Sequence, residues 1–116
     1  MRSDRMRRVD EAMREVLSDA VTQDLKDPRV GFVTVTDVKT SPDLRHARVY
    51  VSVLGTADER AASLEGLQSA HGYLQGRVAS QLRLKHTPQL VFMHDDTAER
   101  AQRVERLLAE DERAGT

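Results

Sequence analysis

The sequence has no cysteine, no tryptophan and few aromatic residues, which make up 3% of its 116 residues. Without cysteine, neither disulfides nor thiolate metal sites can form, and this composition suits a reducing compartment. Only Phe32, Tyr50, Tyr73 and Phe92 are aromatic. RNA recognition by base stacking on a sheet needs several exposed rings on one surface, so the sequence argues against that mode.

Long apolar runs are also missing. No stretch approaches the roughly 20 apolar residues that span a membrane, and the charged N-terminus has no apolar segment typical of secretory signals. We therefore expect a cytoplasmic protein with no membrane partner. A length of 116 residues, with 39% hydrophobic and 32% charged residues, predicts one globular domain that buries roughly two-thirds of the surface of its unfolded chain.

The net charge is only −1, but the charges are unevenly distributed. Residues 1–8 contain four arginines and one aspartate, whereas residues 95–116 contain seven acidic residues and four arginines. Residues 73–92 carry basic side chains and no acidic one. The acidic tail hides the basic character of the body, so the distribution of charge says more about a charged partner than its sum.

An apolar stripe at three- and four-residue spacing predicts a first helix over about residues 4–25. On its opposite face, Asp4 with Arg8 and Asp10 with Arg14 are spaced for ion pairs between successive turns. The Asp-Pro dipeptide that follows is expected to end the helix, because the residue before a proline avoids helical dihedrals. The stripe consists of Met6, Val9, Met13, Val16, Leu17, Ala20 and Val21.

Two segments, residues 30–38 and 46–54, alternate apolar with polar residues and are rich in β-branched side chains, which predicts two strands. Ser41-Pro42-Asp43 supplies turn chemistry between them, so the pair is expected to form an antiparallel hairpin. One face of this hairpin would pack on helices, and the other would expose Arg48 and Tyr50.

A second helix is expected after the hairpin. Thr56 and Glu59 have capping-box spacing and would open this helix, which ends at a break over residues 70–72. Gly66 costs about 1 kcal/mol relative to alanine inside a helix. We interpret it as a sign of close packing or of local weakness.

The remainder of the chain predicts a third helix, a short strand and a last helix. The third helix reaches about Leu84, and alternating side chains place a strand at residues 90–93. The last helix is weakly amphipathic and begins at a cap supplied by Asp96 or Thr97. Its final residues, 111–116, have little to bury and are expected to fray.

The junction Ser69-Ala70-His71-Gly72, between the second and third helices, is the segment most informative about function. Alanine and glycine leave no bulky side chain at this bend, so a flat or charged backbone can approach closely. The alternative is a plain helix–helix connection in which Gly72 only supplies a positive φ. Because the charged residues that follow are all basic, we favour a polyanion, RNA, as the partner.

Basic residues near the bend and at two other places are candidate phosphate contacts. Such contacts position a protein on RNA without reading its sequence, and they weaken as salt rises. The alternative for each is an ordinary solvated face. At the start of the first helix a basic charge also opposes the helix dipole, which favours a functional role there. The candidates are Arg7, Arg8, Arg45, Arg48, Arg77, Arg83, Lys85 and His86, together with Ser69, Ala70, His71 and Gly72 of the bend.

His94-Asp95-Asp96 is the one string that suggests an enzyme, a metal-dependent phosphohydrolase. A metal site needs further ligands, and the other histidines, His46, His71 and His86, lie on separate elements without metal-ligand spacing. Helix capping by Asp96 in a solvated turn is the favoured interpretation. We expect no metal and no cofactor.

Several short sequence strings, spread over nearly the whole chain, are typical of one protein family. They are Arg7-Arg8-Val9, the segment Asp-Leu-Lys-Asp-Pro-Arg-Val-Gly-Phe-Val-Thr-Val-Thr at residues 24–36, Ser-Pro-Asp-Leu-Arg-His-Ala at residues 41–47, Tyr50-Val51-Ser52-Val53, Leu82-Arg83-Leu84 with Pro88, Leu90 and Phe92, and Asp95-Asp96-Thr97. With this order of elements, the chain resembles the ribosome-binding factor A family over about residues 5–108. Lys85-His86 stands where arginine is more usual in the family, and Gln89 where glutamate is often found.

The resemblance implies an α+β, type II KH-like fold, α-β-β-α-kink-α-β, with Ala70-His71-Gly72 at the kink and a C-terminal tail helix. We accordingly expect residues 1–96 to be a KH-like RNA-binding domain and residues 97–116 to be a C-terminal helix with a frayed acidic tail. The resemblance further implies a non-enzymatic factor that binds the small ribosomal subunit, its precursor and its rRNA. It also implies a role in maturation of that RNA and in cold adaptation.

We expect the protein to act as a monomer, with ribosomal proteins as further candidate partners. One alternative function stays open beside the enzyme. The chain could be a protein–protein adaptor of ribosome assembly, whose acidic tail helix binds a basic ribosomal protein.

Overall fold

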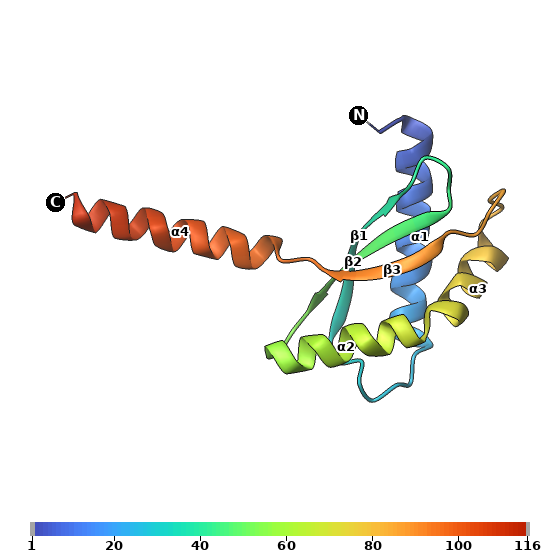
Figure 1. Cartoon of the computed structure of the whole chain (residues 1–116), viewed down its shortest axis with the longest axis horizontal. Helices are drawn as coiled ribbons and strands as arrows, with labels where there is room; N and C mark the ends of the chain where they lie inside the picture. Colours follow the sequence, from blue (N-terminus) through green and yellow to red (C-terminus); the bar gives the residue numbers. More distant parts are fainter. Residues whose placement is uncertain (1, 116) are drawn as a thin grey trace.

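The computed structural model describes residues 2–115 and has the expected order of elements (Figure 1). Met1 and Thr116, the outer ends of the two expected segments, lie outside the described residues. No helix among residues 2–115 is long and apolar enough to cross a membrane. The elements are α1 (Asp4–Gln23), β1 (Val33–Thr40), β2 (His46–Val53), α2 (Ala57–Ser69), α3 (His71–Gln81), β3 (Gln89–His94) and α4 (Thr97–Ala114).

The strands form one sheet in the order β1-β2-β3. β1 and β2 pair antiparallel, as expected for the hairpin, whereas β2 and β3 are parallel, with His46 beside Gln89 and Val51 beside His94. Helices α1, α2 and α3 pack on one face, and alternate residues of β2 and β3 are buried beneath them. The opposite face is exposed to solvent along both strands. We call it the open face.

The core lies between the sheet and the three covering helices. Met13 and Leu17 of α1, Leu74 of α3, Val49 of β2 and Leu90 of β3 are all 0% exposed. Burying a side chain of this size contributes about 1.5–3 kcal/mol relative to leaving it exposed. The core therefore fixes the sheet against the helices and sets the positions of the loops at the sheet ends.

A β-bulge in β1 explains why its buried valines do not alternate. A regular strand buries every second residue, but the register of β1 shifts between Val35 and Asp37. The extra residue, Thr36, brings Val38 to the covered face together with Val35. The expected start of the strand at Val30 is wrong, because Val30 donates its amide to Asp27 in a turn at 3.0 Å.

The ion pairs expected along α1 are wrong in their partners. Asp10 is buried, accepts a hydrogen bond from the Thr40 amide at 2.9 Å and pairs with Arg2 at 2.7 Å. A buried carboxylate needs such partners, so Asp10 ties the start of α1 to the end of β1. The exposed pairs that do form span three residues rather than four, namely Asp4 with Arg7 and Glu11 with Arg14.

The capping box expected at the start of α2 is confirmed. The Glu59 amide donates to Thr56 Oγ1 and the Thr56 amide donates to Glu59 Oε1, each at 3.1 Å. Close packing at Gly66 is confirmed as well, because a Cβ there would lie 2.7 Å from Val30 Cγ2. α2 thus lies directly against the loop that leads into β1.

α4 projects from the body as a separate arm (Figure 1), and none of its described residues is buried. It continues through Ala114, into the segment expected to fray. Asp96 is its N-cap residue, as expected, but the Asp96 side chain makes no capping hydrogen bond. Asp95 Oδ1 instead accepts a hydrogen bond from the Thr97 amide at 3.0 Å. Hydrogen bonds from Thr97 and Thr36 lower the pKa of Asp95 to about 2.

Candidate nucleic-acid interface

The bend between α2 and α3 consists of a single residue, Ala70, with φ −88° and ψ 7°. Ser69 ends α2 and His71 begins α3, and both are exposed. Among the described glycines only Gly55 has a positive φ, so the alternative in which Gly72 supplies one is wrong. A Cβ at Gly72 would meet no atom within 4 Å. The backbone at the start of α3 therefore faces open space.

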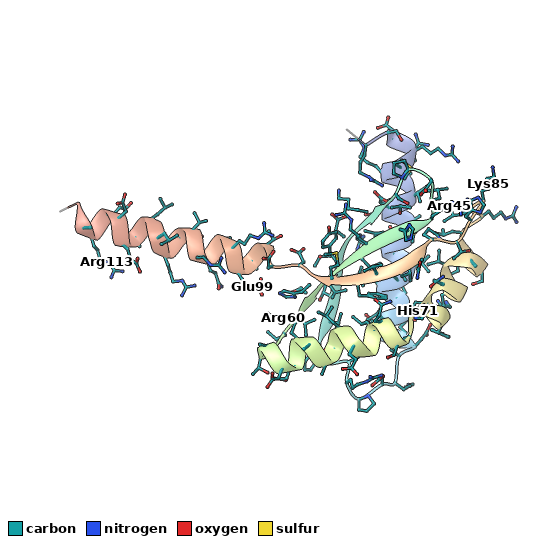
Figure 2. All side chains as sticks on the ribbon, viewed as in Figure 1. Arg45, Arg60, His71, Lys85, Glu99 and Arg113 are labelled. Carbon is teal, nitrogen blue, oxygen red and sulfur yellow. The ribbon has the colours of Figure 1, made fainter. Side chains whose placement is uncertain are left out.

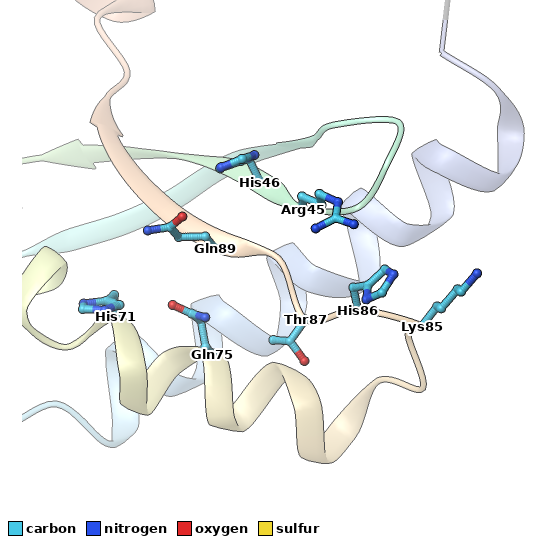
Figure 3. Close-up of a pocket in the computed structure, with 8 residues that line it drawn as sticks. All are labelled: Arg45, His46, His71, Gln75, Lys85, His86, Thr87 and Gln89. Carbon is cyan, nitrogen blue, oxygen red and sulfur yellow. The ribbon is translucent and has the colours of Figure 1, made fainter.

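Beside this bend the protein has a recess of about 680 Å³ whose lining contains no acidic side chain (Figure 3). Its walls come from the start of β2, the first turns of α3 and the loop between α3 and β3, so three separate parts of the chain meet there. We call it the basic recess. It is lined by Arg45, His71, Lys85 and His86, which the sequence predicts as site residues, and by His46, Gln75, Thr87 and Gln89.

The parallel pairing of β2 and β3 holds the basic recess together. The Gln89 amide donates to the Arg45 carbonyl at 2.8 Å, which joins the loop before β3 to the start of β2. Pro88 is fully buried and anchors the same loop. On the helix side, His71 Nδ1 lies 2.7 Å from the Gln68 carbonyl oxygen, so a residue of α2 orients its ring.

The cations of the basic recess are only weakly engaged. Within residues 2–115, Lys85 and His86 make no hydrogen bond or ion pair. Arg45 pairs with Asp43 at 3.9 Å, with its side chain 66% exposed. An exposed ion pair of this length contributes little to the stability of the fold. Arg45 can therefore leave Asp43 and pair with another anion. Figure 2 shows Arg45 and Lys85 close together at the side of the body opposite to α4.

A second basic hollow, of about 310 Å³, lies between α1 and the loop that follows α3. Arg83 comes from the loop, and Arg5 and Arg8 come from α1. The same loop supplies Lys85 to the basic recess, so it connects the two sites. Apolar side chains complete this hollow, namely Val9, Ala12, Leu82 and Leu84.

A third hollow, also of about 310 Å³, adjoins the basic recess through His46, which lines both. Arg48 lines it together with Lys39 and Arg2. The Arg48 guanidinium carbon lies 5.9 Å from the centroid of the Tyr50 ring, within the range of a cation–π contact. We use the name basic band for the basic recess together with these two neighbouring hollows.

Two predicted arginines lie outside the basic band. Arg7 pairs with Asp4 on the exposed face of α1. Arg77 pairs with Asp24 at the end of α1, and Tyr73 donates its hydroxyl to the same carboxylate at 2.7 Å. The acid-free segment does not leave Arg77 unpaired, because its partner comes from another part of the chain. RNA contact at these two arginines stays a prediction.

Four lining residues of the basic recess are absent from the sequence-based prediction. His46 and Gln89 begin β2 and β3, and a parallel pairing of these strands would have placed them side by side. Gln75 lies one helical turn after His71, so its position follows once that side of α3 is known. Thr87 carried no signal in the sequence.

The string His94-Asp95-Asp96 does not form a metal site. Within residues 2–115, no group of three or more histidine, aspartate or glutamate side chains is placed to hold a metal ion. His94 Nε2 lies 3.1 Å from Glu99 Oε1, Asp95 accepts a hydrogen bond from the Thr97 amide, and Asp96 is the N-cap residue of α4. The geometry supports the interpretation of this string as a turn that starts a helix.

Comparison with known proteins assigns the family. A sequence model described as Ribosome-binding factor A matches residues 5–108. The chain belongs to the ribosome-binding factor A family. It is 50% identical over 104 residues to ribosome-binding factor A of Anaeromyxobacter sp., covering 89% of this chain and 85% of the relative.

Solved structures of ribosome-binding factor A show the same fold. The solution NMR structure of a putative ribosome-binding factor A from Thermotoga maritima matches with a TM-score of 0.73 at 36% identity, covering 84% of this chain and 92% of that one. A homology model of the Thermus thermophilus ribosome-binding factor A, fitted into a cryo-EM map of its complex with the 30S subunit, matches with a TM-score of 0.62 at 27% identity, covering 74% and 90%. The expected α+β, KH-like fold is confirmed.

Proposed function

We propose that the chain is a non-catalytic factor that binds the small ribosomal subunit and its precursor through the sugar–phosphate backbone of the small-subunit rRNA. The observation that carries this proposal is the basic recess, in which distant segments bring Arg45, Lys85 and His86 together beside an open bend, with no acidic side chain in the lining. The family supports it, because a Thermus thermophilus relative has been fitted into a map of a 30S complex.

The start of α3 adds a second attraction for phosphate. No side chain caps this helix and no acidic residue lies in its first turn. The first amide groups of a helix lack intrahelical acceptors and favour an anion. Because the space in front of Gly72 is open, a phosphate could approach these amides while neighbouring phosphates contact Arg45 and Lys85.

Binding of this kind is sufficient for a role in assembly. A factor that binds one rRNA conformation more tightly than another shifts the population toward the first by the difference in binding free energy. The factor would hold a region of the rRNA in one arrangement during maturation, including growth in the cold, and then dissociate. We propose that it acts as a cytoplasmic monomer without a cofactor.

Co-sedimentation with purified small subunits tests this proposal. The double variant Arg45→Gln/Lys85→Gln removes two cations of the basic recess, and Lys26→Gln/Arg14→Gln removes two cations that lie outside both the basic band and α4 as a matched control. At intermediate salt we expect the first variant to bind about tenfold more weakly or worse. Because counterion release scales with the number of phosphate contacts, its dependence on salt should also weaken by about 1.5 in the logarithmic slope.

The control should bind about as tightly as the parent, and circular dichroism should show that both variants fold. An equal loss in both variants would show that affinity follows total charge. Unchanged binding of Arg45→Gln/Lys85→Gln would exclude the basic recess as the RNA site.

A further inference from the structure

α4 carries an amphipathic surface that the outward position of the arm leaves in solvent. Val104, Leu107 and Leu108 form an apolar stripe near the middle of the helix, and they are 54%, 57% and 60% exposed. Helices in proteins gain most of their stability by packing such a stripe. In the outward position of α4, no other element of the described chain packs against this apolar stripe.

The open face of the sheet carries an apolar patch on which the stripe of α4 can pack. Val91 and Met93 of β3 are 41% and 40% exposed. Tyr50 of β2 is the register partner of Met93 and is half-buried. Because α1, α2 and α3 pack on the other face, these three side chains are accessible from the side on which α4 can reach them.

The acidic last turns of α4 and the cations of the basic recess match in charge if α4 runs antiparallel to β3. The first ten residues of α4 carry three arginines together with Glu99 and Glu105, and its last turns carry three successive acids. On the body, Asp37 lies at the end of the sheet where α4 begins, with Lys39 and Arg48 beside it, and the cations of the basic recess lie at the opposite end. The residues are Arg100, Arg103, Arg106, Glu110, Asp111 and Glu112 on α4, facing Asp37 and then Arg45, His46 and Lys85 on the body.

The link between β3 and α4 consists only of Asp95 and Asp96. The outward direction of the arm is held by Glu99, whose Oε1 lies 3.1 Å from His94 Nε2 and 3.6 Å from Arg60 Nη2 (Figure 2). Each of these three residues also has a buried polar atom without a hydrogen-bond partner, namely Glu99 Oε2, His94 Nδ1 and Arg60 Nε. Such atoms are costly, so this cluster stabilises the outward position only weakly.

The first turn of α4 already borders the open face. Thr97 and Arg100 line a hollow of about 560 Å³ together with Arg48, Tyr50 and Met93. A rotation at the link would close this hollow by bringing α4 down onto the sheet.

We propose that α4 is a hinged arm that pivots at Asp95-Asp96 and lies antiparallel to β3 on the open face of the sheet. At about 1.5 Å per helical residue, Val104 to Leu108 lie about 10–17 Å from the start of α4. At about 3.3 Å per strand residue, Val91 lies about 10 Å back along β3. The acidic last turns begin about 20 Å from the start of α4, which brings them to the basic recess.

In this position the carboxylates of the last turns take the place of phosphate groups, so α4 competes with RNA. This consequence rests on the function proposed above, whereas the closure itself does not. Because the arm is tethered by a short link, its effective concentration at the open face is in the millimolar range. Contacts too weak to hold a separate helix can therefore populate the closed position.

Distance measurements on the full chain without RNA test the closure. Since the chain has no cysteine, Ala79→Cys on α3 and Ala114→Cys at the end of α4 provide two unique, exposed sites for spin labels. α3 and the end of α4 lie at opposite ends of the molecule when the arm points outward (Figure 1). We expect a second population at a clearly shorter distance.

Three variants probe the contacts that would form or break on closing. The short-distance population should fall at least threefold when the apolar stripe is truncated or the acidic turns are reversed, and it should rise when Glu99 loses its charge. A charge-reversed α1 serves as the control and should leave the population unchanged. The variants are Val104→Ala/Leu107→Ala/Leu108→Ala, Glu110→Lys/Glu112→Lys and Glu99→Gln, with Glu15→Lys/Asp19→Lys as the control.

A long distance alone in the parent chain would overturn the proposal, as would a short distance that the stripe and acidic-turn variants leave unchanged. If the short distance disappeared when the labelled protein was mixed with excess unlabelled protein, the distance would lie between two chains. The open face would then bind α4 of a second copy, which would also overturn the proposal. For RNA, Glu110→Lys/Glu112→Lys should bind small subunits at least threefold more tightly than the equally charged α1 control. A parent chain that closes but never binds small subunits would refute the proposed function and leave the arm intact.

Discussion

Arg77 of α3 and Asp24, the residue that follows α1, form an ion pair that joins the two helices. Tyr73, one turn earlier on α3, donates its hydroxyl to the same carboxylate at 2.7 Å. The side chains of Arg77 and Asp24 are 29% and 21% exposed, so solvent screens the pair only in part. One carboxylate thus positions the helix that carries one wall of the basic recess.

We expect Arg77→Gln and Asp24→Asn each to lower the midpoint of thermal unfolding by a few degrees, because each leaves a half-buried charge without its partner. The double variant should lose little more than either single variant, since both remove the same interaction. Calorimetry measures these shifts. Additive losses would show that the two side chains stabilise the fold independently.

The same two variants test the predicted RNA contact of Arg77. If this arginine also binds phosphate, Arg77→Gln should lose affinity for small subunits while Asp24→Asn should not. Equal affinities for the two variants would limit Arg77 to its role between α1 and α3.

Gly66→Ala and Gly76→Ala should change stability in opposite directions. At Gly66 the added methyl would lie 2.7 Å from Val30 Cγ2 and 3.3 Å from Arg29 Cβ, and overpacking of this kind costs about 1–3 kcal/mol. At Gly76 the methyl would meet nothing within 4 Å, so the higher helix propensity of alanine should add up to about 1 kcal/mol. Urea unfolding measures both. A Gly66→Ala protein more stable than the parent would contradict the close packing of α2.

Gly72→Val should leave the fold intact and weaken binding to small subunits about tenfold, the loss of one contact of about 1.4 kcal/mol. The side chain would enter open space and Gly72 has no positive φ, so no strain is expected. The valine would instead hold the RNA backbone away from the start of α3. Ala61→Val, at an exposed position of α2, is the control for a valine on a helix surface. If Gly72→Val bound small subunits as tightly as the parent, the bend would not be part of the RNA interface.

Stability should depend on pH through Asp95. Its pKa is lowered to about 2 by hydrogen bonds from Thr97 and Thr36, from about 3.9 for an ordinary aspartate. A carboxyl group with a lower pKa in the folded chain stabilises the fold above about pH 4, and this contribution disappears as the pH falls through the folded value. The difference in unfolding midpoint between the parent and Asp95→Asn should therefore shrink between about pH 5 and about pH 2. An Asp95 pKa near 4 by NMR titration would contradict this prediction.

Elements that depend on neighbours in sequence could be predicted in detail. The capping box of Thr56 and Glu59 spans one turn, and the amphipathic stripe of α1 repeats over successive turns, so each is encoded within a few residues. The bulge in β1 escaped prediction, because the alternation up to Thr36 looks regular and only the pairing with β2 reveals the extra residue.

The sequence predicted several residues of the candidate site, but it did not predict that they lie together. Arg45, His71, Lys85 and His86 are recognisable one by one as basic or bend residues, but nothing near them in sequence says that they line one recess. Arg77 belongs to the same basic segment, and its pairing with Asp24 depends on how α1 and α3 meet. An acid-free segment therefore predicts local charge correctly, while the charges that surround it in space come from elsewhere.

By itself, the sequence determined the family, the order of the elements, the small bend at Ala70 and the excess of basic residues that follows it. Only the tertiary structure decided which cations share a surface, because the parallel pairing of β2 and β3 joins residues 45–46 to residues 85–89. It also decided that the apolar stripe of α4 and the open face of the sheet are both left in solvent. Periodicity and capping act over one or two turns of chain, whereas a shared surface depends on contacts between segments that are distant in sequence.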